Sequence, residues 1–349
     1  MKQYTILSDS EKIYEQMLLD IESAREEIFL ETYIFEDDAI GRSFRDLLIK
    51  KVLDGVRVRL LIDAWGSSIR KKFFKKFIDA GGEVRFFREL RYALRWFNAN
   101  HERNHRKLLL IDKEISYIGS INITKKSLKW RELVLRIDSP LTKAFRQLFL
   151  KTWKYFNLFT TKKMKKISYE GFEVIPDFPS QIDRPTEKRY GQLIRRAKKE
   201  ILIETPYFIP SPFIRKALRK AVKRGVKVKI VLPHNSDLRL VDVLRDRTLG
   251  KLYRMGVKMF YYPKILHSKL LIVDNGLFLL GSSNLDYRSF IHQYEVNLLG
   301  RDKEILKDLK DYFEENLKIS KPFDYSVWKK RTLKSRFVGR ILHIIRELF

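Results

Sequence analysis

Two stretches of this sequence decide its fold: HRKLLLIDKEISYIGSIN, residues 105–122, and HSKLLIVDNGLFLLGSSN, residues 267–284. Both follow the pattern HxKx4Dx6GSxN with identical spacing. In each stretch, two aliphatic runs separated by a short polar segment predict two strands joined by a tight turn. The turns fall at residues 112–113 and 274–276. A single match would be weak evidence, but two matches in register indicate a duplicated unit.

The sequence around the two stretches repeats as well. The matching segments are EEIFLETYIF (from Glu26) and KEILIETPYFI (from Lys199), FRDLLIKKVLDGVRVRLLID (from Phe44) and IRKALRKAVKRGVKVKIVLP (from Ile214), and GGEVRFFREL (from Gly81) and MGVKMFYYPK (from Met255). They predict a strand, an amphipathic helix that ends at a glycine, and further strands in the same order. We therefore expect an α/β protein of two tandem lobes, each a mixed β-sheet flanked by helices, related by pseudo-two-fold symmetry.

Composition changes suggest where the lobes begin and end. We expect an N-terminal lobe over residues 1–155, a basic connector over 156–175 and a C-terminal lobe over 176–325. Residues 326–349 form a separate basic segment, in which Phe337, Ile341, Ile345 and Leu348 share one helical face. Such a helix is typical of proteins that lie on a membrane surface. The alternative is a terminal helix packed on the core.

The net charge of the chain indicates the class of partner that it attracts. Lysine and arginine number 72 and aspartate and glutamate 43, which gives a formal net charge of +29. A surface of this charge attracts polyanions, either nucleic acid or anionic membrane. The alternative explanation of the positive charge is that the proteome is lysine-rich in general. The sequence contains no cysteine, which excludes disulfides, thiolate metal sites and a cysteine nucleophile.

The hydropathy pattern bears on location. No apolar run reaches the ~20 residues that span a membrane. The first residues turn polar before the apolar core of a signal peptide forms. We therefore expect a soluble or peripheral protein that faces the cytoplasm, and the sequence leaves its oligomeric state open.

The motif residues suggest phosphoryl chemistry. Side chains two apart in a strand share a face, so His105 points the same way as Lys107, and His267 the same way as Lys269. Each edge then holds a nucleophile or acid next to a fixed cation. The GSxN turns add hydroxyl and amide groups, which we expect to bind the substrate phosphate: Ser120, Asn122, Ser282 and Asn284.

A two-step transfer follows if the two edges face each other. One imidazole attacks phosphorus and forms a phosphohistidine. The other protonates the leaving oxygen and then deprotonates the incoming alcohol or water. No metal or other cofactor is needed. The remaining histidines, His101, His234, His292 and His343, have no such frame and are expected to be incidental.

Four acidic residues belong to the predicted site. An attacking imidazole needs its second nitrogen held, and Glu132 and Glu295 fall at nearly matched distances after the two GSxN turns. Their alternative role is an ordinary ion pair with a neighbouring arginine. Asp112 and Asp274 are motif members and are grouped with the catalytic residues, although their places at turns favour a structural role.

These residues together resemble the phospholipase D superfamily and, within it, bacterial cardiolipin synthases. The resemblance extends from about residue 4 to 320 and includes TYIFEDDAIG (from Thr32), WREL (from Trp130), TPYFIPS (from Thr205) and GSSNLDYRSFIHQYEVN (from Gly281). It implies a phosphatidyltransferase that moves a phosphatidyl group onto phosphatidylglycerol and makes cardiolipin. It also implies that His105 is the nucleophile and His267 the acid and base, and it places an acid at Glu132 and at Glu295.

One departure concerns the membrane. Many cardiolipin synthases begin with membrane-spanning helices, and this sequence shows none. Contact with anionic phospholipids, phosphatidylglycerol and cardiolipin among them, is then expected through the basic surface, at the cytoplasmic face of the bacterial inner membrane. Three alternatives remain open: a nuclease of the same superfamily, a hydrolytic phospholipase D, and a basic scaffold without activity.

Overall fold

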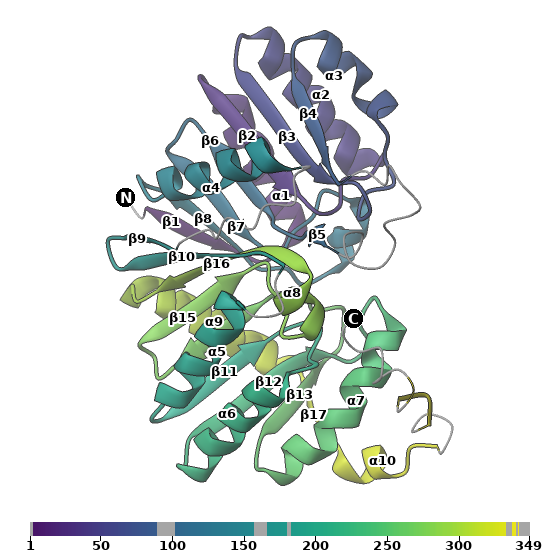
Figure 1. The fold of residues 1–349 in the computed structure, drawn as a ribbon, viewed down its shortest axis with the longest axis vertical. Helices are drawn as coiled ribbons and strands as arrows, with labels where there is room; N and C mark the ends of the chain where they lie inside the picture. Colours follow the sequence, from purple (N-terminus) through teal and green to yellow (C-terminus); the bar gives the residue numbers. More distant parts are fainter. Residues whose placement is uncertain are drawn as a thin grey trace.

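The computed structural model describes residues 3–88, 102–156, 166–179, 183–332, 337–339 and 341. The chain folds into two lobes, one above the other in Figure 1. The first comprises β1 (Tyr4–Leu7), α1 (Ser10–Ser23), β2 (Glu27–Thr32), α2 (Ala39–Leu53), β3 (Arg57–Asp63), the 3₁₀ helix η1 (Lys71–Phe74), α3 (Lys75–Asp79), β4 (Glu83–Phe87), β5 (Arg103–Asn104), β6 (Leu108–Ile111), β7 (Ile115–Gly119), η2 (Lys125–Lys129), β8 (Val134–Asp138) and α4 (Thr142–Tyr155).

The second lobe repeats this order. It comprises β9 (Ile167–Tyr169), β10 (Phe172–Asp177), α5 (Pro185–Arg196), β11 (Glu200–Glu204), α6 (Pro212–Lys223), β12 (Lys227–Pro233), α7 (Arg239–Arg254), β13 (Lys258–Tyr262), β14 (Leu270–Val273), β15 (Leu277–Gly281), α8 (Tyr287–Ile291), β16 (Gln293–Gly300), α9 (Lys303–Ile319), β17 (Lys321–Pro322) and α10 (Tyr325–Lys329). Gly55 and Gly225 have φ angles of 87° and 85° just after α2 and α6, as the glycine pattern predicts.

The two sheets have the same strand order. The first runs β1-β8-β7-β6-β2-β3-β4, and the second contains β10-β16-β15-β14-β11-β12-β13 with β9 and β17 added at its edges. In each sheet three neighbouring strands are parallel and the others antiparallel. The predicted α/β duplication with mixed sheets is therefore confirmed.

Helices cover both faces of each sheet. Helices α1, α2 and α3 pack on one face of the first sheet, and α5, α6 and α7 on one face of the second. The other faces carry α4 and α9, and their core is shared between the lobes: Phe145 and Phe149 of α4 belong to the same buried cluster as Leu309 and Phe313 of α9. This continuous apolar core, of the kind that dominates folding energetics, fixes the two lobes against each other.

One predicted boundary needs adjustment. The described part of the expected connector, residues 166–175, belongs to the second sheet, because β10 pairs with β16 along residues 173–177. The many basic residues of the expected connector led to the prediction of a linker instead of strands. In the expected terminal helix, Ile345 and Leu348 lie outside the described residues, while Phe337 and Ile341 are 62% and 49% exposed. None of the helices in the described ranges is both long and apolar enough to cross a membrane.

Candidate active site

The site forms at the boundary between the lobes, where backbone segments of one lobe are hydrogen-bonded to segments of the other. The N–H of His105 donates to the carbonyl of Tyr294 at 2.9 Å, next to Glu295. In the mirrored place, the N–H of His267 donates to the carbonyl of Arg131 at 2.8 Å, next to Glu132. These bonds extend β5 onto β16 and the segment before β14 onto the segment before β8. Each histidine is thereby placed beside a glutamate of the opposite lobe.

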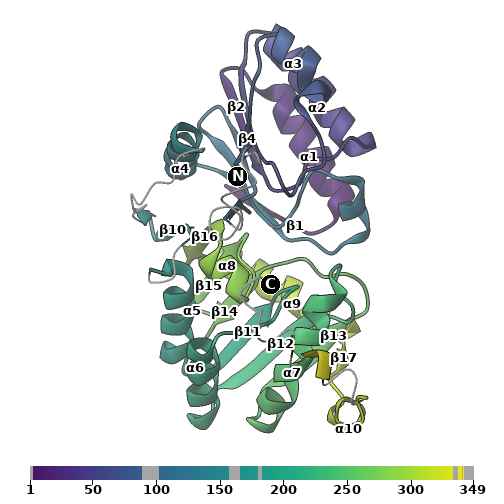
Figure 2. The same ribbon diagram turned by 45° about the vertical axis from the view of Figure 1, so that its right-hand side comes forward.

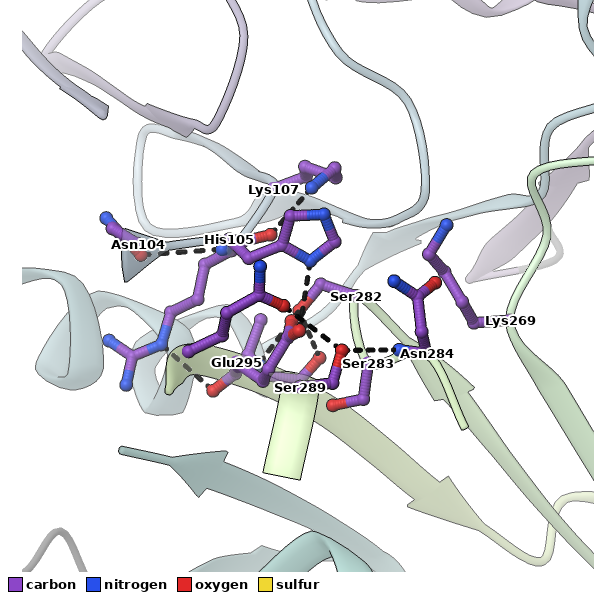
Figure 3. A network of polar contacts seen from close by, with 12 residues as sticks. Asn104, His105, Lys107, Lys269, Ser282, Ser283, Asn284, Ser289 and Glu295 are labelled. Atoms are coloured by element: carbon purple, nitrogen blue, oxygen red, sulfur yellow. Dashed lines mark hydrogen bonds and ion pairs between the residues drawn. The ribbon is translucent and has the colours of Figure 1, made fainter. Parts of the chain in front are cut away.

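The side chains complete this crossed arrangement. Nδ1 of His105 lies 3.0 Å from Oε1 of Glu295, and Nδ1 of His267 lies 3.0 Å from Oε2 of Glu132. All four side chains are buried. Because Nδ1 of each ring is engaged by a carboxylate, Nε2 is the nitrogen available for chemistry. Figure 3 shows the first of these pairs.

The motif serines hold the glutamates. The hydroxyl of Ser120 donates to Glu132, and the hydroxyl of Ser282 donates to Glu295. Each hydroxyl also accepts a backbone N–H, from Leu133 at 2.9 Å in the first lobe. Both serines are fully buried. Their predicted role in binding phosphate is therefore wrong: their hydrogen bonds are used to fix the carboxylates.

The motif lysines lie beneath the histidines on the same strand edges. Nζ of Lys107 donates to the carbonyl of His105 at 2.7 Å, and Nζ of Lys269 to that of His267 at 2.5 Å. The side chains are 4% and 2% exposed. Burial lowers the pKa of Lys107 to about 7 and that of Lys269 to about 8. Both cations thus lack a direct carboxylate partner among the described hydrogen bonds, and an anionic substrate would stabilise them.

The two histidine–glutamate pairs differ in their electrostatics. Burial, with Lys107 adding to it, lowers the pKa of His105 well below its ordinary value. Burial also lowers the pKa of His267, but Glu132 opposes this shift. Burial raises the pKa of Glu295 to about 7, whereas for Glu132 the effect of burial is outweighed by His267 and Lys269, and its pKa is lowered. The second pair is therefore the one that better stabilises an imidazolium.

A cavity of about 270 Å³ lies between the lobes. His105 and His267 line it together with the motif amides Asn122 and Asn284, so the structure brings the predicted pair of imidazoles and both amides to one place. Oδ1 of Asn122 accepts the N–H of Ile34 at 3.2 Å, so its amide nitrogen is the group that can donate to a ligand in the cavity that Asn122 lines. Such a group suits the non-bridging oxygens of a phosphodiester.

Asp112 and Asp274 lie away from this cavity. The carboxylate of Asp112 accepts the N–H groups of residues 25, 26 and 27 at 2.7, 2.7 and 2.9 Å. That of Asp274 does the same for residues 198, 199 and 200. Their grouping with the catalytic residues is corrected, because each one caps the start of a neighbouring strand instead of facing substrate.

Other cavity residues escaped sequence reasoning. The ring of Tyr33 lies 5.0 Å from that of His105, and the ring of Trp130 lies 5.1 Å from that of His267. The remaining wall residues are Ile34, Trp65, Tyr207, Asp237, Leu238, Val241, Asp286, Arg288 and Gln293. Most follow the carboxyl ends of strands, a position that marks binding loops in α/β sheets. Only that position, and not a motif, would have identified them.

The other histidines lie in different surroundings. The ring of His234 is exposed and packs on Tyr261 at 5.4 Å, and the carbonyl of His292 accepts the N–H of Arg103. His101 and His343 lie outside the described residues. Within the described ranges, no three or more histidine and acidic side chains gather in a way that would hold a metal ion.

Known proteins are similar to this chain in sequence and in fold. The chain is 32% identical over 358 residues to the major cardiolipin synthase of Bacillus subtilis, covering 97% of this chain and 74% of that protein. It is 33% identical over 360 residues to cardiolipin synthase 1 of Staphylococcus epidermidis, with 98% and 73% covered. The crystal structure of phosphatidylserine synthase from Haemophilus influenzae has a TM-score of 0.80 at 14% identity, covering 100% of this chain and 96% of that one, a likeness of fold alone.

The family comparison covers both lobes. A family profile described as "Cardiolipin synthase, PLD-like domain" matches residues 17–153 and 190–317, which include both motifs, both orienting glutamates and most of the two sheets. The chain therefore belongs to the cardiolipin synthase family of phospholipase D-like proteins.

Proposed function

We propose that this protein is a phosphatidyltransferase that makes cardiolipin from phosphatidylglycerol through a phosphohistidine intermediate. The observation that carries the proposal is the pair of crossed histidine–glutamate contacts at one cavity, each beside a buried lysine. Two imidazoles held by Nδ1 supply the nucleophile and the acid that a two-step displacement needs. Relatives named cardiolipin synthase, matched over nearly the whole chain, support the lipid substrate.

In the first step, Nε2 of His105 attacks phosphorus of the donor lipid. The bond from phosphorus to the leaving glycerol oxygen breaks, and His267 gives that oxygen its proton. In the second step, His267 takes the proton of an acceptor hydroxyl, whose oxygen attacks phosphorus and frees His105. Two observations support these roles: the pKa of His105 is lowered further than that of His267, and Glu132, whose own pKa is lowered, is charged beside His267.

The two lysines and one motif amide serve the phosphoryl group. Lys107, Lys269 and Asn122 stabilise the charge on the non-bridging oxygens as it develops. The binding of an anionic phosphodiester raises the pKa of both lysines, because it supplies the negative charge that their buried sites lack. The enzyme acts as a peripheral protein at the cytoplasmic face of the membrane, where its net charge of +29 favours anionic lipid.

The test uses vesicles of phosphatidylglycerol and, separately, plasmid DNA. The wild-type protein is expected to form cardiolipin and to leave the DNA intact. His105→Ala and His267→Ala are each expected to abolish cardiolipin formation while the proteins remain folded. Phosphatidic acid without cardiolipin would make the protein a hydrolase, and cleaved DNA without lipid products would make it a nuclease.

A further inference from the structure

The catalytic parts of the two lobes match, but the walls of their shared cavity do not. Aligned from Gly55 and Gly225, Ser67 of the first lobe corresponds to Asp237 of the second. Ser67 is buried, and its hydroxyl bonds to the backbone of Tyr33 and Phe35 at 3.0 and 2.9 Å. Asp237 instead is exposed and lines the cavity. A carboxylate therefore faces a site that is meant for an anionic phosphodiester.

Asp237 is held in place by a tyrosine of the same wall. The hydroxyl of Tyr207 donates to Oδ1 of Asp237 at 2.7 Å. Within the described part of the chain, Oδ2 of Asp237 makes no hydrogen bond. This oxygen remains free to accept a hydroxyl from a bound molecule.

A second acceptor lines the same cavity. Oδ1 of Asn284 is buried, in a side chain only 3% exposed, and has no hydrogen-bond partner among the described residues. Its counterpart Asn122 uses Oδ1 to accept the N–H of Ile34. A buried amide oxygen without a partner is costly unless a ligand or water satisfies it. Within the described residues, the second lobe thus offers two oxygen acceptors without a hydrogen-bond partner. The matching residues of the first lobe, Ser67 and Asn122, use their oxygens for hydrogen bonds within the protein.

The chemistry of these acceptors defines their ligand. A carboxylate repels phosphate but accepts hydroxyl groups well, and two acceptors lining one cavity suit a molecule with several adjacent hydroxyls. We infer that Asp237, Tyr207 and Asn284 form a polyol subsite that binds the hydroxyl groups of glycerol, both in the leaving group and in the acceptor alcohol.

The position of this polyol subsite fits the order of the reaction. His267 lies close enough to Asp237 for the carboxylate to raise the pKa of the imidazole. In an in-line displacement the leaving and entering oxygens occupy the side opposite the nucleophile, which is the side of His267. The subsite therefore holds a glycerol next to the group that exchanges its proton.

This inference rests on the proposed function, and the test separates the two. Two alcohols of equal carbon number are supplied to phosphatidylglycerol vesicles: ¹³C-glycerol, and 1-propanol, which lacks the two additional hydroxyls. Mass spectrometry measures labelled phosphatidylglycerol and phosphatidylpropanol, and their ratio gives the preference for a polyol. The wild-type protein is expected to prefer glycerol, and Asp237→Asn is expected to lower this preference roughly 10-fold.

The ratio of labelled phosphatidylglycerol to phosphatidylpropanol excludes an indirect effect through His267. Loss of the Asp237 charge also changes the proton affinity of His267, but that change slows both alcohols alike. Tyr207→Phe is expected to lower the ratio in the same direction by a smaller factor. The matched control is Asp37→Asn in the first lobe, where the carboxylate is half exposed and pairs with Arg42 outside the cavity; its ratio is expected to equal that of the wild type.

Two results would overturn the inference. One is an unchanged glycerol preference in Asp237→Asn, and the other is a wild-type protein without any preference. A wild-type protein that forms neither phosphatidyl product nor cardiolipin would overturn the proposed function itself, and the subsite with it, whether or not phosphatidic acid is released.

Discussion

Nδ1 of His105 lies 3.0 Å from Oε1 of Glu295, 190 residues further along the chain. The reciprocal contact joins His267 to Glu132 across the same boundary. Neither lobe therefore contains a complete histidine–carboxylate pair. Backbone hydrogen bonds from each histidine to the residue before the opposite glutamate fix this exchange.

The crossed pairs predict which glutamate supports which step. Glu295→Gln is expected to impair the nucleophile, so that little phosphohistidine forms. Glu132→Gln is expected to impair the acid and base, so that phosphohistidine accumulates from a donor whose leaving group needs no proton, such as a p-nitrophenyl ester. Each change is expected to lower kcat by roughly 10²–10⁴, because the imidazole loses its required tautomer. Acid-quenched mass spectrometry of the protein measures the intermediate.

Alanine variants of the histidines provide the matched controls. His105→Ala is expected to behave like Glu295→Gln, and His267→Ala like Glu132→Gln. If Glu132→Gln instead behaved like His105→Ala, the glutamates would act within their own lobes, contrary to the structure.

The hydrogen bonds of Asp112 predict that its replacement lowers stability but not catalytic activity. Its carboxylate accepts three backbone N–H groups at the start of β2. Asp112→Ala leaves these donors unsatisfied and is expected to lower the free energy of unfolding by about 1–3 kcal/mol. The specific activity of the folded protein should stay within about twofold of wild type, since the carboxylate lies outside the cavity.

Denaturant unfolding checks this prediction against Asp79→Ala. Asp79 is exposed and, among the described residues, pairs with Lys75 at the surface, which contributes about 0–1 kcal/mol. A stable but inactive Asp112→Ala protein would restore the aspartate to the catalytic residues.

The repeat explains why much of the fold could be predicted from the sequence. Two lobes of matching strands and helices follow from periodicity and from the glycines after α2 and α6. The sequence could also identify both histidines and both glutamates. It could not predict that each glutamate belongs to the histidine of the other lobe, because that pairing depends on backbone bonds between distant segments.

Side chains of one motif can also have different roles for reasons that spacing does not reveal. Ser120 and Asn122 are two residues apart and were expected to bind phosphate together. Only the amide faces the cavity, since the hydroxyl donates to Glu132. Asp237 belongs to no motif, and its counterpart in the first lobe is Ser67, so only the folded cavity identifies it.

Lys107 predicts a conflict between stability and activity. Its cation is buried, which lowers its pKa from 10.5 to about 7. Below pH 7 the buried lysine is charged, and the folded protein is destabilised by the full cost of burying that charge. This cost declines as pH rises from 7 toward the pKa of the lysine in the unfolded chain. Lys107→Met is therefore expected to raise the free energy of unfolding at pH 6 by about 1–4 kcal/mol, while kcat falls roughly 10²–10³-fold.

Thermal and denaturant unfolding at pH 6 and pH 9 measure this difference, with the exposed Lys125→Met as control. The stabilisation is expected to be larger at pH 6. Destabilisation of Lys107→Met at pH 6 would show that its hydrogen bond to His105 outweighs the cost of burial.

The pH dependence of kcat/KM follows from the same groups. His105 must be neutral and His267 protonated, and the pKa of each is lowered, that of His105 further. Lys107 and Lys269 lose their charge near pH 7 and 8. The optimum is therefore expected below pH 7, where His267 keeps its proton. The rate is expected to decline as His267 loses that proton, and to decline further as the lysines lose their charge through pH 7–8.

A rate profile from pH 5 to 9 on phosphatidylglycerol in mixed micelles tests this expectation. Glu132→Gln removes the carboxylate that raises the pKa of His267, so its alkaline decline is expected to begin at lower pH. An optimum above pH 8 would contradict the assigned protonation states.

The central claim is tested most directly by locating the intermediate. His267→Ala protein is mixed with a p-nitrophenyl phosphatidyl donor, quenched, digested and analysed by mass spectrometry. The account predicts a phosphatidyl group on the imidazole of His105 and none on any other residue. A phosphatidyl group on a different residue, or an unmodified protein that still releases p-nitrophenol, would contradict it.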